Sequence, residues 1–321
     1  MARRRATLVF NPNAGSWDWE DAIRAFSAFW QHRGWSISLQ PTKYTGHATE
    51  LARRAASSGH ELVFAAGGDG TLNEVANGLA FTDTIMAPVP LGTANSFAKE
   101  LGIPIGNRTR RDWILDTLQA LADGDVRRMD LGLCSNGRYW LLWAGMGIDG
   151  WIIDHIEPRS RLFKRFGAVG YGLKSFVLLP GFQGVSGKVC VDGQSVEGDF
   201  LMVNVSNCRL YAGGEIELNR GAVLDDGLFE IWIFKGRYWV PLLRHIAKVA
   251  LGRHRRDPDV YLLSGKSVSV ETAKPTPFHL DAEPAGTTPF SCEVKQGALR
   301  LLTPHGTRAG LFAQPGISLS G

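Results

Sequence analysis

The stretch ELVFAAGGDGTLNEV, residues 61–75, decides the fold of this chain. Its first five residues form a short apolar run of the kind found in buried strands, and a helical pattern follows from Thr71 to Leu79. Between them lies the turn Gly67-Gly68-Asp69-Gly70. A strand that ends in a glycine-rich turn and leads into a helix is the repeating unit of an α/β layer, so we expect parallel strands here.

The same alternation continues on both sides of this stretch, over the first 125 residues. Strands are predicted over 6–10, 35–39, 61–65 and 85–91, with helices over 18–32, 48–57, 71–79 and 94–101. Strands joined through helices of this length lie parallel, with right-handed crossovers. The sequence therefore predicts an α/β domain with a parallel sheet over residues 1–128.

Beyond residue 128 the pattern changes to strand-like runs separated by Gly and Asp turns. Strands are expected over 138–144, 187–191, 200–205, 229–234, 260–263, 267–271 and 298–302, with helices over 169–179 and 239–251. Asp192-Gly193 between apolar runs predicts a hairpin. We expect a mainly antiparallel β domain over 129–305 and a tail over 306–321 that packs back on the first domain.

Composition excludes several classes of protein. The 321 residues carry 35 Lys and Arg against 31 Asp and Glu, a net charge of +4, which gives little support for nucleic-acid binding. The four scattered cysteines form no C-x-x-C pair, so we expect reduced thiols in a cytoplasmic protein. The apolar run after the first arginines is too short for a signal peptide, and no window is long enough for a spanning helix. We therefore expect a soluble protein.

Glycine is abundant, at 38 of 321 residues against a usual share of about 7%. Three of the glycine-bearing loops follow predicted parallel strands, namely 11–15, 67–71 and 91–95. Ligands bind outside these strand ends in open α/β sheets, and glycine lets backbone amides close around an anion. A carboxylate such as Asp69 beside phosphates fits a role in holding Mg²⁺ or organising donors. The three loops together favour a nucleotide site, although a single loop of this kind is more often structural.

These motifs resemble those of the diacylglycerol kinase catalytic-domain family, which includes soluble bacterial lipid kinases and is related to sphingosine kinases. The resemblance rests on NPNAG at 11–15, GGDGTLNEV at 67–75 and PLGTAN at 90–95, and it continues through GMGID at 145–149 and DDGLF at 225–229. It implies a transferase that phosphorylates a lipid hydroxyl, diacylglycerol-like or sphingoid, with ATP and Mg²⁺ in a cleft between the domains. The β-rich domain would then bind the lipid substrate.

The resemblance also implies the residues of the site. Those expected to contact ATP are Asn11, Pro12, Asn13, Ala14, Gly15, Thr45, Gly67, Gly68, Asp69, Gly70, Thr71, Leu72, Asn73 and Thr93. Asp226 is similar to the family's Mg²⁺ carboxylate, with backbone carbonyls of Val223 and Leu228 completing the metal site. Without the family, the Asp225-Asp226-Gly227 segment would be interpreted as a solvated turn.

One segment departs from the family pattern. The family has Asp-Gly-Glu where this chain has Asp281-Ala282-Glu283. Both carboxylates are retained, and we assign the base for the acceptor hydroxyl to Glu283, with Asp281 and Asp69 as rivals. If the glycine serves a positive φ, alanine would distort the loop and lower activity. On a strand, Asp281 and Glu283 would share one face.

Alternatives remain open. An NAD kinase-like enzyme is suggested by Asn73-Glu74 and by Gly67–Thr71, a motif that resembles those of NAD kinases and phosphofructokinases, whose α/β fold the first domain would then share. A nucleotide-binding regulatory module with lapsed kinase activity is suggested by Ala282. Two segments combine apolar and basic residues, 240–256 and 159–166, which suits an anionic membrane surface. For 240–256 an ordinary helix that faces the core is the favoured interpretation. A homodimer is compatible with the sequence, and the histidines, including His279, are interpreted as structural or surface residues.

Overall fold

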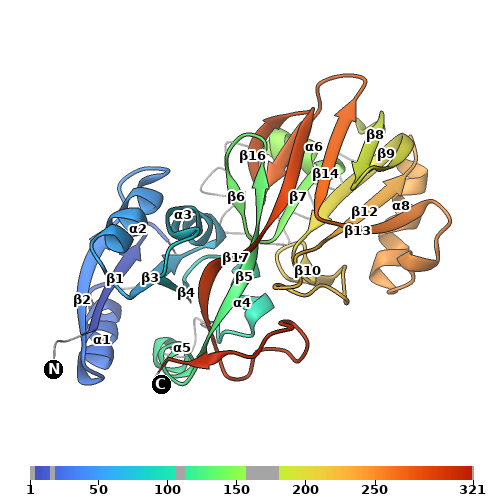
Figure 1. Ribbon diagram of the computed structural model, residues 1–321. Coiled ribbons are helices and arrows are strands. Elements are labelled where there is room, and N and C mark those ends of the chain that lie inside the picture. The colour runs from blue at the N-terminus through green and yellow to red at the C-terminus, as the bar shows by residue number, and fades with distance from the viewer. Residues whose placement is uncertain (1–3, 15–18, 106–112, 157–180, 320–321) are drawn as a thin grey trace. The chain divides into compact units, whose positions relative to one another are not determined.

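The computed structural model describes residues 4–14, 19–105, 113–156 and 181–319 (Figure 1). The described residues form two compact units. The first unit is drawn from Met1–Leu131, Leu224–Asp226 and Gln296–Gly321, and the second from Gly132–Val223 and Gly227–Lys295. The helix predicted over 169–179 and the basic segment 159–166 lie outside the described residues.

The first unit contains the predicted parallel sheet. Its strands are β1 (Arg4–Phe10), β2 (Trp35–Pro41), β3 (Leu62–Gly67) and β4 (Ile85–Pro90), paired in the order β2-β1-β3-β4 with every pair parallel. All residues of β3 and β4 are buried, as expected for strands covered on both faces. The fold class predicted from the alternating pattern is confirmed.

Helices connect and cover these strands. They are α1 (Trp19–His32), α2 (His47–Ser57), α3 (Asp69–Leu79), α4 (Ser96–Leu101) and α5 (Trp113–Ala122), of which α5 was not predicted. Helix α2 packs against α3, and α1 packs against α5 (Figure 1). Strand β5 (Asp125–Cys134) pairs antiparallel with the short β18 (Ile317–Ser318), which joins the end of the chain to the first unit.

The second unit is mainly antiparallel, as predicted. Its strands are β6 (Tyr139–Trp140), β7 (Trp143–Gly147), β8 (Val185–Val191), β9 (Gln194–Ser206), β10 (Leu210–Tyr211), β11 (Ile216–Glu217), β12 (Phe229–Lys235), β13 (Val260–Gly265), β14 (Ser267–Thr272), β15 (Pro277–Leu280), β16 (Glu283–Thr287) and β17 (Phe290–Thr303). The path β16-β15-β7-β9-β8-β14-β17 forms the main sheet, and β12 joins β9 to β13. Strand β17 continues into the first unit, where it pairs parallel with β4.

The predicted hairpin at Asp192-Gly193 is confirmed. Val191 pairs with Gln194, and the two turn residues have φ values of 45° and 88°. Both central residues of a type I′ turn require positive φ, which Asp and Gly tolerate. The Asp192 carboxylate accepts hydrogen bonds from the amides of Lys266 and Ser267, and the Lys266 amide is the main cause of its lowered pKa.

Three details of the prediction for this half need correction. The single strand expected over 138–144 is two strands, β6 and β7, because the amides of Leu141 and Leu142 bond to the Asp281 carboxylate instead of a neighbouring strand. Strand β9 is much longer than 200–205. Helix α6 (Ile148–Ile156) was not predicted.

The helix predicted over 239–251 is present as α8 (Trp239–Ala250), followed by the 3₁₀ turn η2 (His254–Arg256). The expectation that it faces the core is wrong. Only Leu242 and His245 are buried, and most of its large apolar side chains are exposed. None of the described helices is long and apolar enough to cross a membrane.

Candidate active site

Two glycine turns meet backbone to backbone at the carboxyl ends of β3 and β4. A Cβ added to Gly92 would lie 2.5 Å from the Cα of Gly68, and one added to Gly67 would lie 2.6 Å from the Thr71 side chain. No positive φ is involved at these positions, so glycine is required by close approach alone. The turns therefore present bare backbone, as a phosphate-binding loop must.

Helix α3 begins inside the first of these turns. Gly68 is its N-cap and supplies no side-chain hydrogen bond, so the amides of the first turn have no side-chain cap. The positive end of the helix dipole and these amides face the turn, which favours an anion. Thr71 lies in the first turn of the helix and adds a hydroxyl donor.

Asp69 holds the two turns together. Its Oδ2 accepts from the Ser96 amide at 3.1 Å and its Oδ1 from the Phe97 amide at 3.0 Å, which caps the N-terminus of α4. Asn95, with a left-handed φ of 51°, closes the same turn by bonding both the amide and the carbonyl of Gly92. Asp69 thus organises the loop that carries Thr93, which is exposed.

The first predicted loop lies beside β3. The Asn11 amide donates to the carbonyl of Ala66 at 3.1 Å, and the Asn11 side chain accepts from the Asn13 amide at 2.9 Å. The Ala14 amide donates to the Asn11 carbonyl, which completes a tight turn, and Pro12 within it is exposed. The remaining member of this motif, Gly15, lies outside the described residues.

Sequence reasoning missed the part that Glu74 plays in positioning the loop of Thr45. Glu74 of α3 accepts from the amides of Gly46 and Ala48 at 2.8 and 3.0 Å, and so caps α2. The exposed Thr45 lies in the turn just before this helix. The sequence did indicate that α2 needs a cap from elsewhere, because this helix begins after a glycine and has no Ser, Thr, Asp or Asn at its N-cap.

Leu72 and Asn73 differ from the other predicted nucleotide residues because their side chains are buried. Leu72 is fully buried, and the Asn73 side chain accepts from the Asn77 amide nitrogen at 2.9 Å. The main chain of Leu72, and not its buried side chain, is therefore suited to the nucleotide contact expected of it.

In the second unit, Asp281 and Ala282 form a two-residue hairpin turn. Leu280 pairs with Glu283 across the turn, and the turn residues have φ values of 49° and 62°. The expectation that Asp281 and Glu283 share one strand face is wrong, because the chain reverses between them. Ala282 does occupy the left-handed region, and the turn forms all the same.

The two carboxylates of this segment have different surroundings. Asp281 is buried and accepts hydrogen bonds from the amides of Leu141, Leu142 and Trp143 at 2.8–3.1 Å. The Glu283 side chain is 41% exposed, with its Oε2 2.9 Å from Nη2 of Arg138. Asp281 is thus committed to the backbone of the β6–β7 segment, while Glu283 remains open to solvent.

A buried polar network supports the same turn and was not predicted. His279 Nδ1 accepts from the Ala282 amide at 3.3 Å, so its Nε2 carries the proton that points to Asp149 Oδ2, 3.1 Å away. The Tyr211 hydroxyl donates to the same oxygen at 3.2 Å. Gly145 makes room for this pair, since a Cβ there would lie 2.3 Å from Asp149 Oδ2 and 2.5 Å from His279 Nε2.

The proposed metal ligands lie in the turn that precedes β12. Asp225 accepts from the amides of Ala313 and Gln314, whereas Asp226 is exposed. One carboxylate with backbone carbonyls, those of Val223 and Leu228, is an oxygen donor set that suits Mg²⁺. The described residues contain no cluster of three or more His, Cys, Asp or Glu that could hold a metal.

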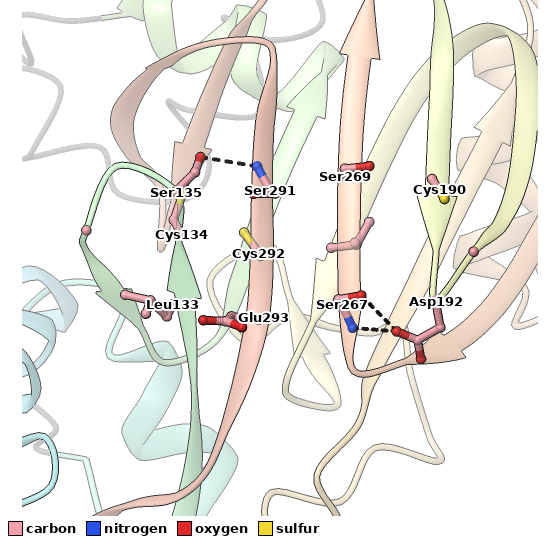
Figure 2. A pocket seen from close by; sticks show the side chains of 13 residues that line it. Leu133, Cys134, Ser135, Cys190, Asp192, Ser267, Ser269, Ser291, Cys292 and Glu293 are labelled. Atoms are coloured by element: carbon pink, nitrogen blue, oxygen red, sulfur yellow. Dashed lines mark hydrogen bonds between the residues drawn. The ribbon is translucent and has the colours of Figure 1, made fainter.

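A separate pocket in the second unit contains none of the predicted site residues. Figure 2 shows its walls, where Cys134, Cys190 and Cys292 come from β5, β8 and β17. All four cysteines are free. A hydrogen bond with the Cys292 thiol lowers the pKa of Cys134 to about 6. The two glycines that line it, Gly137 and Gly193, lie in turns between antiparallel strands, and no helix N-terminus lines it, so we do not assign the nucleotide site to this pocket.

A parallel sheet with bare glycine turns at its strand ends, together with an antiparallel β unit, has the features of a nucleotide-binding protein of the α/β type. Residues 5–134 match the diacylglycerol kinase catalytic domain, and residues 144–303 match the YegS C-terminal NAD kinase beta sandwich-like domain. The chain belongs to the diacylglycerol kinase family and is a lipid kinase.

Individual relatives support this assignment. A diacylglycerol kinase of Bacillus subtilis is 30% identical over 288 residues, which cover 89% of this chain and 92% of the relative. One of Staphylococcus saprophyticus is 28% identical, covering 94% and 96%. The crystal structure of a putative diacylglycerol kinase from Bacillus anthracis, 24% identical, superposes with a TM-score of 0.77 over 96% of this chain and 100% of that one. It confirms the two-part fold.

Proposed function

We propose that this lipid kinase transfers the γ-phosphoryl group of Mg²⁺-ATP to a hydroxyl of a diacylglycerol-like or sphingoid lipid. The observation that carries the nucleotide part is the contact between Gly68 and Gly92, which leaves only backbone at two parallel strand ends. The names of the relatives support the lipid part. Family membership sets aside the NAD kinase alternative.

In this proposal the glycine turns hold the triphosphate. Amides of 11–14 and 67–73 and the hydroxyls of Thr45, Thr71 and Thr93 would contact the nucleotide, and Gly15 completes the first loop. Phosphoryl transfer depends mainly on positioning and on neutralising charge, which backbone amides and a helix N-terminus supply. Mg²⁺, when bound, would neutralise phosphate charge, and Asp226 with the carbonyls of Val223 and Leu228 would hold a structural ion.

We assign the base for the acceptor hydroxyl to Glu283. Its carboxylate is exposed, and Arg138 on one side fixes its direction. Asp281 is a weaker candidate because three amides already occupy its two oxygens. Asp69 is likewise occupied by two amides, which supports an organising role for it in the nucleotide loops.

The lapsed-activity alternative rested on Ala282. That hairpin retains its two-residue geometry with alanine in the left-handed region, so the carboxylates on either side keep their places. This favours an active enzyme. A membrane lipid as acceptor further implies that a cytoplasmic enzyme works at the inner face of a membrane.

The test is mass spectrometry of the products formed from a total lipid extract with labelled ATP and Mg²⁺, with NAD as a parallel acceptor. We expect a phosphorylated lipid and no NADP. The variant Glu283→Gln should lower kcat by about 10²–10⁴-fold, the range for loss of a general base, without changing Tm. Glu197→Gln is the matched control, because Glu197 is an exposed strand residue paired with Lys188. Full turnover in Glu283→Ala would refute the base assignment.

A further inference from the structure

Helix α8 presents its most apolar side to solvent. At 100° per residue, Trp239, Val240, Leu243, Ile246, Ala247 and Ala250 fall in one continuous sector of about 120°. All six are exposed, with Trp239 at 45%, Val240 at 60% and Ile246 at 49%. We call this sector the α8 apolar face. Leu251 continues this face just beyond the end of the helix, the N-cap residue Tyr238 precedes the helix, and both are exposed.

The opposite sectors of the helix explain why it lies this way round. Leu242 packs into an apolar cluster with Leu201 and Phe182, while the cations face an acidic loop. Asp257, whose side chain is fully buried, lies 3.0 Å from Lys248 Nζ and 3.3 Å from Arg244 Nε. Arg244 also pairs with Asp259, which raises the pKa of Arg244.

The direction of the Asp257 pKa shift agrees with the ion pairs seen in this anchor. Burial alone would raise the pKa of Asp257, but the Asp259 amide, Lys248 and Arg244 outweigh it and lower the pKa. The charges on α8 are therefore used to fix the helix on the second unit. The exposed apolar face is a consequence of that anchoring.

Further cations surround the helix. Arg237 precedes it, and Arg253, Arg255 and Arg256 follow it, all of them exposed. Segment 237–259 carries six Lys and Arg against two Asp, a net +4 that equals the charge of the whole chain. Figure 1 shows α8 on the outer side of the second unit, beyond β9 and β12.

We propose that the α8 apolar face inserts into the surface of an anionic lipid bilayer, with the flanking arginines on the lipid headgroups. This rests on the proposed function, in which the acceptor is a membrane lipid. Aromatic residues at the edge of an exposed apolar face, with cations beside it, are what an interfacial helix requires. A second copy of this chain fits less well, because pairing two such faces would bring the arginines of both copies together.

The experiment is sedimentation with vesicles of phosphatidylglycerol and phosphatidylcholine, without ATP. We expect the full chain to bind these vesicles, to bind pure phosphatidylcholine weakly, and to lose affinity as salt shortens the Debye length from about 10 Å at 0.1 M. The double variant Leu243→Glu with Ile246→Glu should lower the partition coefficient at least tenfold. Leu115→Glu, an equally exposed leucine on α5, is the control and should bind like the parent chain.

Activity assays on two forms of the lipid distinguish a failure of this inference from a failure of the proposed function. With a short-chain diacylglycerol dispersed in detergent, the double variant should keep the parent kcat, which also shows that it is folded, while its activity on vesicle-embedded lipid falls. Equal vesicle binding by parent and double variant would overturn the inference, and so would absence of binding by the parent. Loss of a dimer in the double variant, with vesicle binding unchanged, would assign the face to a second copy. If the parent binds vesicles through α8 but phosphorylates no lipid, the proposed function fails and the inference stands.

Discussion

Two kinds of turn in this molecule place different demands on the backbone. The glycine turns after β3 and β4 require close approach of two main chains, and the hairpin turn between β15 and β16 requires a left-handed φ. In the first, Gly68 and Gly92 are so close that a Cβ on Gly92 would lie 2.5 Å from the Cα of Gly68. In the second, Ala282 occupies the left-handed region at φ 62°. Close approach excludes every side chain, whereas a left-handed φ costs an alanine only about 1–2 kcal/mol. A side chain at Gly92 would thus force the two turns apart, whereas alanine fits the hairpin turn with its backbone in place.

The two kinds of turn share one hydrogen-bonding arrangement. In each, an aspartate accepts hydrogen bonds from the backbone amides of another segment, Ser96 and Phe97 for Asp69, and Leu141 to Trp143 for Asp281. The difference lies in what the held segment carries. Asp69 orders a loop proposed to bind phosphate, and Asp281 orders the strands behind the proposed base.

The largest expected effect is that of Asp69→Asn. Asp69 now accepts hydrogen bonds from two backbone amides, one on each carboxylate oxygen. In the asparagine variant the side-chain NH₂ group would replace one of these oxygens and face a backbone N–H donor, so one hydrogen bond would be lost. The loop bearing Thr93 would then lose its fixed position. We expect kcat to fall by about 10³-fold, at the upper end of the range for removal of one preorganised electrostatic group. Steady-state kinetics with Asp21→Asn, an exposed carboxylate of α1, as the control measures this. An unchanged kcat would show that Asp69 has no role in the active site.

The next largest effect concerns the close approach of Gly68 and Gly92. Gly92→Ala should force Gly68 and Gly92 apart, destabilising the chain by about 1–3 kcal/mol and raising the KM for ATP. Gly221→Ala, where an added Cβ meets nothing within 4 Å, is the control and should stay within about 0.5 kcal/mol of the parent. Urea unfolding gives both free energies. A neutral Gly92→Ala would mean that the close approach is not needed.

Asp281→Asn tests whether Asp281 stabilises the fold through its hydrogen bonds to the β6–β7 segment. Three backbone amides would lose part of a charged acceptor, so we expect about 2 kcal/mol of destabilisation, the scale of hydrogen bonds to a charged group. Activity at saturating substrate should fall far less than in Glu283→Gln. The opposite pattern, intact stability with lost kcat, would make Asp281 the base and contradict our assignment.

The smallest effect is a gain. Ala282→Gly should stabilise the chain by about 1 kcal/mol, because glycine adopts the left-handed conformation without strain while losing somewhat more freedom on folding. Thermal unfolding against the parent measures it. A loss of stability on this substitution would show that the methyl group of Ala282 makes packing contacts that outweigh the strain.

Much of the fold could be read from local patterns. Apolar runs of the right length predicted β1 to β4, and Asp192-Gly193 predicted its hairpin, because buried strands and type I′ turns have local sequence requirements. Contacts between distant residues could not be read in the same way. The break between β6 and β7 depends on Asp281, about 140 residues away, and the cap of α2 depends on Glu74 of another helix.

The sequence by itself determined the glycine turns, their order along the chain and the family, because these are properties of consecutive residues. Only the tertiary structure decided which glycines are sterically required, which carboxylate is left open, and which side of α8 faces solvent. The apolar spacing of α8 indicated a helix that faces the core, but Asp257 and Asp259 hold its cations against the second unit. A hydrophobic pattern fixes the existence of an amphipathic face, and partners distant in sequence decide where that face points.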